Sequence, residues 1–126
     1  MFTKDEVEKA TMEYFDGDAL ATNVFMTKYC LRDTHGNFVE KTPDDMHHRM
    51  AKEFARIEQK FVTDSDSHLE EAEIYGFFKD FKYIVPQGSP MMGIGNDYVN
   101  VSLSNCVVVD NPQDSVSSIM DAGKDL

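Results

Sequence analysis

A change in sequence pattern near residue 83 constrains the fold of this chain more than any other feature. Before this point, apolar residues recur at three- and four-residue steps, which is the period of amphipathic helices. After it come glycine, proline, serine and β-branched residues, with apolar side chains at alternating positions. The pattern predicts an α+β fragment, with a helical region over residues 1–83 and a region of strand character over residues 84–126.

Local signals predict several helices in the first region. Thr3 followed by Glu6 is typical of a capping box, and Thr42 followed by Pro43 is typical of a helix start. A polar break over 63–67 interrupts the apolar pattern. The expected helices begin after Thr3, cover 19–29, begin after Thr42 with a Met and Phe stripe that reaches Phe61, and cover 69–81.

Two strands are expected in the second region. Apolar and polar residues alternate over Val99–Leu103, which is the period of a half-buried strand. Cys106–Val109 is a continuous apolar run, as in a strand covered on both faces. The eleven residues Pro86–Asn96 contain two prolines and three glycines, a composition that argues against any regular element there.

The end of the sequence predicts an incomplete fold. Asp114 or Ser115 is expected to cap a last helix that runs to Leu126. A strand covered on both faces needs neighbouring strands, but the sequence pattern predicts at most two or three short strands. The last helix also stops without a glycine cap or a proline. We therefore expect a chain that is cut in the middle of its fold.

Composition and charge exclude several classes of protein. The 126 residues suffice for one domain, and 23 acidic against 12 basic residues give a net charge of −11, which disfavours a nucleic-acid binder. No apolar run of about 18 residues and no signal-peptide pattern occur, so we expect a cytoplasmic protein without a membrane partner. Cys30 and Cys106 lie far apart without CxxC spacing, which argues against a zinc site and a disulfide framework.

Two segments carry side chains suited to metal or redox chemistry. His47 and His48 follow two aspartates, but adjacent residues on a helix point about 100° apart, so the two imidazoles do not converge on one metal ion. Ser102–Cys106 places a cysteine after small polar residues, as in a redox thiol beside a polar pocket. A buried structural cysteine is the alternative that the residue types alone favour.

Three segments, in this order, resemble the start of the catalytic barrel of ribonucleotide reductase large subunits. They are Ser89–Met92, Ser102–Val109 and Asp114–Ile119. Upstream, the stretches that resemble the helical lead-in of the same subunits, most closely in the adenosylcobalamin-dependent branch, are Tyr29–Asp33, Glu40–Met46 and Arg49–Ala51. The resemblance covers roughly residues 20–126. It implies a helical region followed by the first strands and helix of a ten-stranded α/β barrel.

The resemblance also implies a role for each matching residue. Cys106 matches the redox-active thiol on the first barrel strand, one of the pair that becomes a disulfide. Substrate-binding positions are matched by Ser89 and Asn105. The helix start that contacts the allosteric effector nucleotide is matched by Asp114, Ser115 and Val116.

The function implied by the resemblance is the reduction of ribonucleotides to deoxyribonucleotides for DNA synthesis by thiyl-radical chemistry. The radical cysteine, the second redox cysteine and the C-terminal cysteine pair are missing, so the chain is expected to be inactive alone. Implied partners are the rest of the catalytic subunit, a ribonucleotide substrate, a deoxynucleotide or ATP effector, a thioredoxin-like reductant, and adenosylcobalamin bound mainly outside this chain. Two alternatives stay open: a non-catalytic nucleotide-binding regulatory module and an unrelated helical interaction domain.

Overall fold

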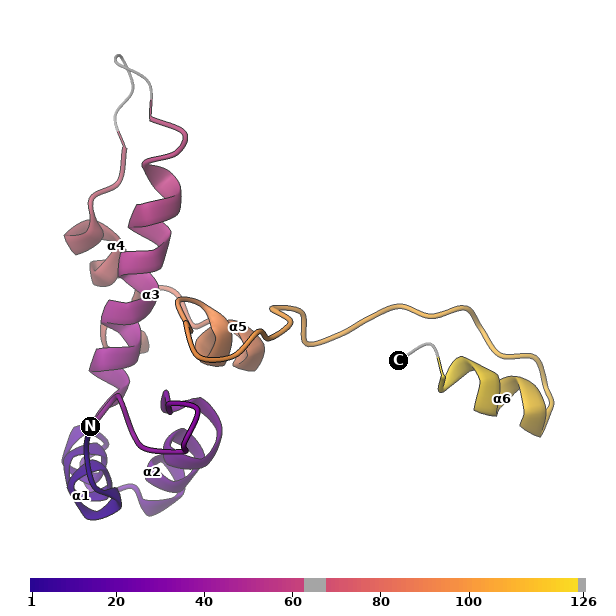
Figure 1. Cartoon of the computed structure of the whole chain (residues 1–126), viewed down its shortest axis with the longest axis horizontal. Helices are drawn as coiled ribbons and strands as arrows, with labels where there is room; N and C mark the ends of the chain where they lie inside the picture. Colours follow the sequence, from indigo (N-terminus) through magenta and orange to yellow (C-terminus); the bar gives the residue numbers. More distant parts are fainter. Residues whose placement is uncertain (63–67, 125–126) are drawn as a thin grey trace.

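The computed structural model describes residues 1–62 and 68–124 as a helical body from which a C-terminal arm extends (Figure 1). The helices of the body are α1 Lys4–Tyr14, α2 Ala19–Val24, the π-helix η1 Phe25–Tyr29, α3 Pro43–Glu58, α4 Glu71–Phe78, the 3-10 turn η2 Lys79–Phe81 and α5 Gly88–Gly93. Helix α6, Val116–Ala122, lies at the end of the arm (Figure 1). The break expected over 63–67 lies outside the described residues.

Two predicted helix starts are confirmed, and both depend on local hydrogen bonds. At α1 the Thr3 N–H donates to the Glu6 carboxylate at 2.8 Å, and the Glu6 N–H donates back to the Thr3 hydroxyl at 3.3 Å. At α3 the Asp45 carboxylate accepts from the Thr42 N–H at 3.0 Å, with Pro43 in the first turn. These bonds satisfy backbone donors that a helix start otherwise leaves unpaired, so the sequence signal is sufficient by itself.

The core lies where α3 meets α4, α1 and η1. Met46 and Met50 of α3 are fully buried, as is Val7 of α1, while Ile74 and Phe78 approach from α4. The expected Met and Phe stripe of α3 is therefore core in its first half. Its second half is not covered in the same way, because the later apolar side chains of the stripe are partly or mostly exposed, namely Phe54, Ile57 and Phe61.

The expected strands are wrong. Over residues 1–62 and 68–124 there is no strand, only the isolated bridges Phe2–Phe38 and Arg32–Phe38. Of the segments expected to form strands, 99–103 lies beside α5, with Val101 and Leu103 next to Gly93, and 106–109 runs along the extended arm, where Val108 is 100% exposed. A strand needs a second strand to pair its N–H and C=O groups, and the described part of the chain supplies none. The α+β class and the start of a ten-stranded barrel are therefore replaced by an all-helical fold.

The region expected to be irregular contains helix α5. Pro90 is its third residue, within the first turn, where a backbone N–H has no partner inside the helix. At Gly88 an added Cβ would lie 3.3 Å from the Tyr29 ring, so glycine allows α5 to approach η1 closely. Within the described ranges, none of the helices combines the length and apolar character that crossing a bilayer requires.

His47 of α3 is a buried polar group that the sequence did not single out as core. It is fully buried, neither ring nitrogen has a hydrogen-bond partner, and its ring lies 4.5 Å from that of Phe81. The two nearest carboxylates accept hydrogen bonds from tyrosines instead, Asp44 from Tyr75 at 2.6 Å and Asp80 from Tyr14 at 3.4 Å. Burial lowers the pKa of His47, and the charges of Asp44 and Asp80 oppose this only in part.

We expect the chain to lose stability on acidification because of His47. The pKa of His47 is lower in the folded than in the unfolded chain, so the unfolded chain binds a proton more readily as the pH falls. The free energy of unfolding therefore keeps its full value with respect to His47 above about pH 6.5 and decreases below that pH. The loss reaches at most about 1.4 kcal/mol per pH unit. Urea unfolding between pH 7 and 5 should show this slope reduced in His47→Phe but kept in the control His48→Phe, which removes an exposed imidazole. Equal slopes in the two variants would contradict the assignment.

Candidate functional site

The structure brings together two residues for which the sequence predicted a common role. The Ser89 N–H donates to the Asn105 side-chain oxygen at 2.8 Å, and the Asn105 amide donates to the Gln87 side chain at 2.8 Å. These bonds join the first turn of α5 to the start of the arm, across sixteen positions of sequence. Cys106 follows Asn105 directly and is an exposed free thiol. Gln87, Ser89 and Asn105 thus form one small polar cluster, which we call the α5 cluster, and Cys106 is its neighbour in the sequence.

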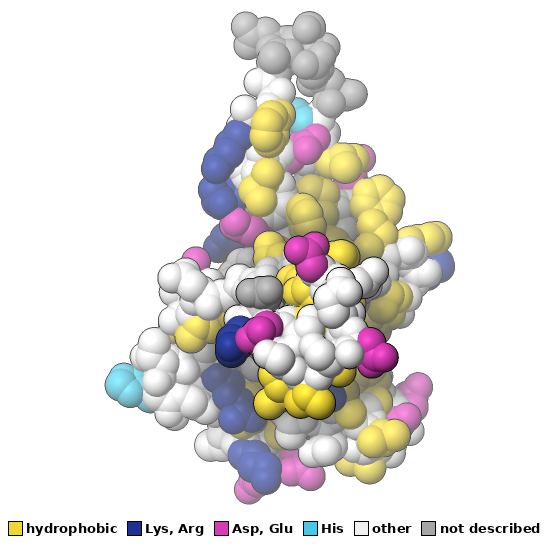
Figure 2. Space-filling view, turned by 90° about the vertical axis from the view of Figure 1, so that its right-hand side faces the viewer, with side chains coloured by type: hydrophobic (Ala, Val, Ile, Leu, Met, Phe, Trp, Pro, Cys, Tyr) yellow, Lys and Arg dark blue, Asp and Glu magenta, His cyan; other side chains and the backbone are white. Residues whose placement is uncertain are grey.

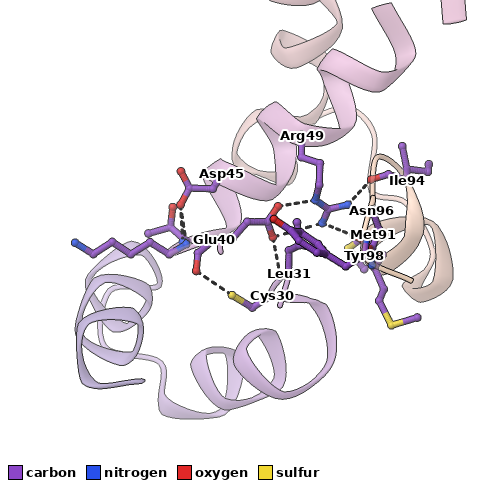
Figure 3. A network of polar contacts seen from close by, with 12 residues as sticks. Cys30, Leu31, Glu40, Asp45, Arg49, Met91, Ile94, Asn96 and Tyr98 are labelled. Atoms are coloured by element: carbon purple, nitrogen blue, oxygen red, sulfur yellow. Dashed lines mark hydrogen bonds and ion pairs between the residues drawn. The ribbon is translucent and has the colours of Figure 1, made fainter. Parts of the chain in front are cut away.

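A buried ion pair holds α5 in place. The Arg49 guanidinium of α3 lies 2.5 Å from the Glu40 carboxylate, and both side chains are less than a tenth exposed. Arg49 also donates to the carbonyl oxygen of Met91, at 2.9 Å, and to that of Ile94 at the end of α5 (Figure 3). One side chain therefore anchors both the middle and the end of the helix that carries Ser89.

Glu40 has further partners on its other side. Its second carboxylate oxygen accepts from the Leu31 N–H at 2.9 Å, and its backbone carbonyl accepts from the Cys30 thiol at 3.2 Å (Figure 3). Burial, followed by the charge of Glu40, raises the pKa of Cys30 to about 12. Cys30 is thus a buried, protonated thiol, and it lacks the thiolate form that makes a cysteine reactive. The α5 cluster and the segment 30–31 are linked through the pair Glu40–Arg49.

The predicted effector-binding residues lie apart from this cluster. Ser115 caps α6, since its hydroxyl accepts from the Ser118 N–H at 3.2 Å. Asp114 is exposed beside it, and Val116 is 79% exposed. The arm places all three far from α5 (Figure 1). The structure therefore brings Ser89 and Asn105 together, whereas the predicted effector-binding residues stand at an exposed helix start apart from them.

The two histidines weighed as metal ligands have different surroundings. His47 is buried against Phe81, whereas the His48 ring stacks on Tyr75 at 3.9 Å and lies 3.8 Å from the Asp44 carboxylate. In the described part of the chain, no three His, Cys, Asp or Glu side chains gather as a metal site would require.

Sequence reasoning did not identify the structural role of Arg49 in holding α5. It lies on α3 beside the core residue Met50, and the carbonyls it binds are 42 and 45 positions further along the chain. Every residue has a backbone carbonyl, so the residue types at these positions do not indicate that Arg49 binds there. No sequence pattern could therefore have predicted the contact. Glu40, nine positions before Arg49, is the one partner whose charge was a usable signal.

One comparison with known proteins gives a match. The family model described as "Ribonucleotide reductase, all-alpha domain" matches residues 15–97. Neither the curated proteins nor the solved structures contain a match. The matched residues include α2, η1, α3, α4 and α5, together with the pair Glu40–Arg49 and Ser89. Asn105, Cys106 and the start of α6 lie beyond them.

Proposed function

The chain belongs to the ribonucleotide reductase family through its all-alpha domain, and from this premise we propose that it is the N-terminal part of a reductase catalytic subunit. In this proposal it acts only together with the rest of that subunit, in the cytoplasm. The assembled enzyme reduces ribonucleotides to deoxyribonucleotides. The chain supplies one reducing thiol and part of the substrate and effector sites.

The observation that carries the proposal is the contact between Ser89 and Asn105. The resemblance assigned both positions to substrate binding, and a hydrogen bond of 2.8 Å joins the Ser89 backbone N–H to the Asn105 side-chain oxygen across sixteen positions of sequence. The exposed Cys106 thiol is the next residue. In this proposal the Ser89 hydroxyl, which is free of the bond that its backbone N–H makes to Asn105, and the Asn105 amide hold a ribose or phosphate for reduction by Cys106.

Cys106 has a defined place in the reduction. Loss of the ribose 2′-hydroxyl as water consumes two electrons and two protons, which two thiols supply when they become a disulfide. Cys106 gives one thiol of this pair. Cys30 does not give the other, because it is buried and bonded to the Glu40 carbonyl. The second thiol must come from the rest of the subunit, with a Cα within about 7 Å of that of Cys106.

Adenosylcobalamin remains a proposal for the assembled enzyme only. A radical-generating cofactor must lie beside the cysteine that it oxidises, and in this chain one cysteine is buried while the other is assigned to substrate reduction. The residues of this chain therefore do not fit a cobalamin site, and no step is derived through the cofactor. For the effector, we propose that Asp114, Ser115 and Val116 contact the nucleotide once the subunit is assembled.

The test is a mixing experiment with a separately produced downstream portion of a reductase subunit, encoded next to this chain and lacking an all-alpha domain. We expect each part alone to be inactive and the mixture to form deoxyribonucleotides from ribonucleotides with dithiothreitol as reductant, assayed with di- and triphosphates and with adenosylcobalamin added or omitted. A mixture without activity would count against the proposal. Saturable deoxynucleotide binding by the chain alone would instead favour the regulatory module.

A further inference from the structure

His47 is the one buried side chain whose nitrogens lack hydrogen-bond partners among residues 1–62 and 68–124. A neutral imidazole has one N–H donor and one acceptor nitrogen, and burying both without partners costs free energy. A phenylalanine or leucine would fill the same space without this cost. What an imidazole has, and an apolar side chain lacks, is a change of charge near neutral pH.

The turn that packs on His47 has an unfavourable backbone conformation. In η2, Asp80 and Phe81 have φ angles of 54° and 55°, in the left-handed region that residues other than glycine rarely occupy. Phe81 is the more costly of the two, since aspartate tolerates this region better than a residue with a bulky ring. The Phe81 ring lies 4.5 Å from the imidazole, centroid to centroid, at an angle of 77°. The contact with His47 therefore helps to hold a turn that is strained by itself.

The imidazole is surrounded by charged and titratable groups from four helical elements. The groups that face it, or contact those that do, are Asp44 and His48 of α3, Lys79 and Asp80 of η2, Tyr75 of α4 and Tyr14 of α1. Tyr75 donates to Asp44 at 2.6 Å, whereas Tyr14 donates to Asp80 at the longer distance of 3.4 Å. Asp80 is therefore the carboxylate that changes partner more readily.

We propose that His47 is the sensor of an acid-sensitive switch, in which protonation of its imidazole releases the η2 turn from α3. An imidazolium has two N–H donors and a charge, and the apolar contact with Phe81 satisfies neither. Asp80 or water can accept from it only if η2 moves, because both ring nitrogens lack a partner while the turn is in place. Burial lowers the pKa of His47, so the switch is closed near neutral pH.

The movement is confined to the connection between α4 and α5. Helix α4 is fixed in the core, and Arg49 holds α5 from α3. In the connection, the Lys82 N–H donates to the Lys79 carbonyl at 3.1 Å, and the Ile84 N–H donates to the carbonyl of the α4 residue Phe77 at 2.9 Å. These two bonds close the segment onto the end of α4, so the two amides report whether it opens.

Little protein covers the outer side of this connection. Tyr83 and Val85 are 68% and 62% exposed, and Ile84 between them is partly exposed as well. Hydrophobic side chains also gather at the surface over α3 and α4 in the space-filling view (Figure 2). In the described part of the chain, no further layer therefore opposes an outward movement of the segment.

The experiment follows the unsubstituted chain by NMR as the pH is lowered from about 7.5 to about 5. At neutral pH, nuclear Overhauser contacts should join the ring protons of His47 and Phe81. We expect these contacts to disappear with the midpoint of the His47 ring titration, below the usual histidine value of about 6.5. The amide signals of Lys82 and Ile84 should change with the same midpoint, whereas that of Leu31, outside the segment, should not.

Three variants identify the sensor. His47→Phe keeps an aromatic ring against Phe81 but does not titrate, so the signals of Lys82 and Ile84 should no longer respond to pH. Asp80→Asn removes a charge that favours the imidazolium and should lower the midpoint by about half a pH unit. The control His48→Phe, which removes the exposed neighbouring imidazole, should keep the response. Thermal melts at neutral pH check that each variant is folded.

The proposed function does not enter this inference, because the measurement uses the chain alone. Ring contacts between His47 and Phe81 that persist in the protonated state would overturn the proposal. Amide signals of the connection that ignore the His47 titration would do the same, and so would unfolding of the whole chain before His47 is protonated. A response that survives in His47→Phe would show that another group is the sensor.

Discussion

Replacement of Arg49 by methionine is expected to lower the free energy of unfolding of the chain by about 3–5 kcal/mol. The substitution keeps the length of the side chain but leaves the Glu40 carboxylate buried without its cation. It also removes the donors to the carbonyls of Met91 and Ile94. The cost is that of an uncompensated buried charge, which exceeds what the ion pair itself contributes.

Urea unfolding followed by circular dichroism measures this loss, and a second arginine provides the control. Arg56 pairs with Glu53 at 2.6 Å, but its side chain is 55% exposed, so Arg56→Met should cost less than about 1 kcal/mol. The double variant Glu40→Leu with Arg49→Met should recover part of the stability, because no unpaired charge then remains buried. Similar losses in Arg49→Met and Arg56→Met would refute the role of burial.

The same ion pair explains which parts of this fold could be predicted from sequence. The starts of α1 and α3 were predictable because Thr3 bonds to Glu6 and Thr42 to Asp45, three positions away. The position of α5 was not, since it depends on a guanidinium more than forty positions earlier. Helix ends are local chemistry, whereas the packing of one helix on another depends on contacts that residue order does not reveal.

The wrong strands have a related physical reason. The alternation over 99–103 describes what a strand would present to a core, but pairing requires a second strand as well. In the described structure Val101 and Leu103 lie beside Gly93 of α5 without pairing to a strand, and further along the arm Val107 and Val108 face solvent. A period-two pattern therefore describes only which side chains are apolar. The backbone hydrogen bonds that make a strand require a neighbouring strand.

The residues of the candidate site stay predictions, and their arrangement in space could not be predicted from the sequence. The family resemblance assigned Ser89 and Asn105 to substrate binding, and only the structure shows the hydrogen bond between them. The same resemblance assigned Asp114 to Val116, and these residues remain separate at the end of the arm. Residue identity suggests candidate groups, whereas their arrangement depends on the helices that carry them. Here α5 has such support, from Arg49, and α6 lacks it.

Substitution of Cys106 by serine is expected to reduce ribonucleotide reduction by the assembled enzyme to background. Serine keeps the size and exposure of the side chain, but a hydroxyl cannot form a disulfide, so the two-electron reduction has no second sulfur to complete it. The matched control is Cys30→Ala, which removes the other thiol of the chain. Cys30 is 8% exposed and its pKa is raised to about 12, so no redox role is expected for it.

The two variants separate the redox role of Cys106 from a general effect of losing a cysteine. Cys30→Ala deletes one buried sulfur and its contact to the Glu40 carbonyl, which should cost about 1 kcal/mol of stability and leave turnover unchanged. Cys106→Ser should melt like the unsubstituted chain, because Cys106 is exposed, and should still bind the downstream portion. Loss of turnover with binding and stability intact therefore identifies Cys106 as a reducing thiol. Full turnover in Cys106→Ser would show that the reducing pair lies entirely outside this chain.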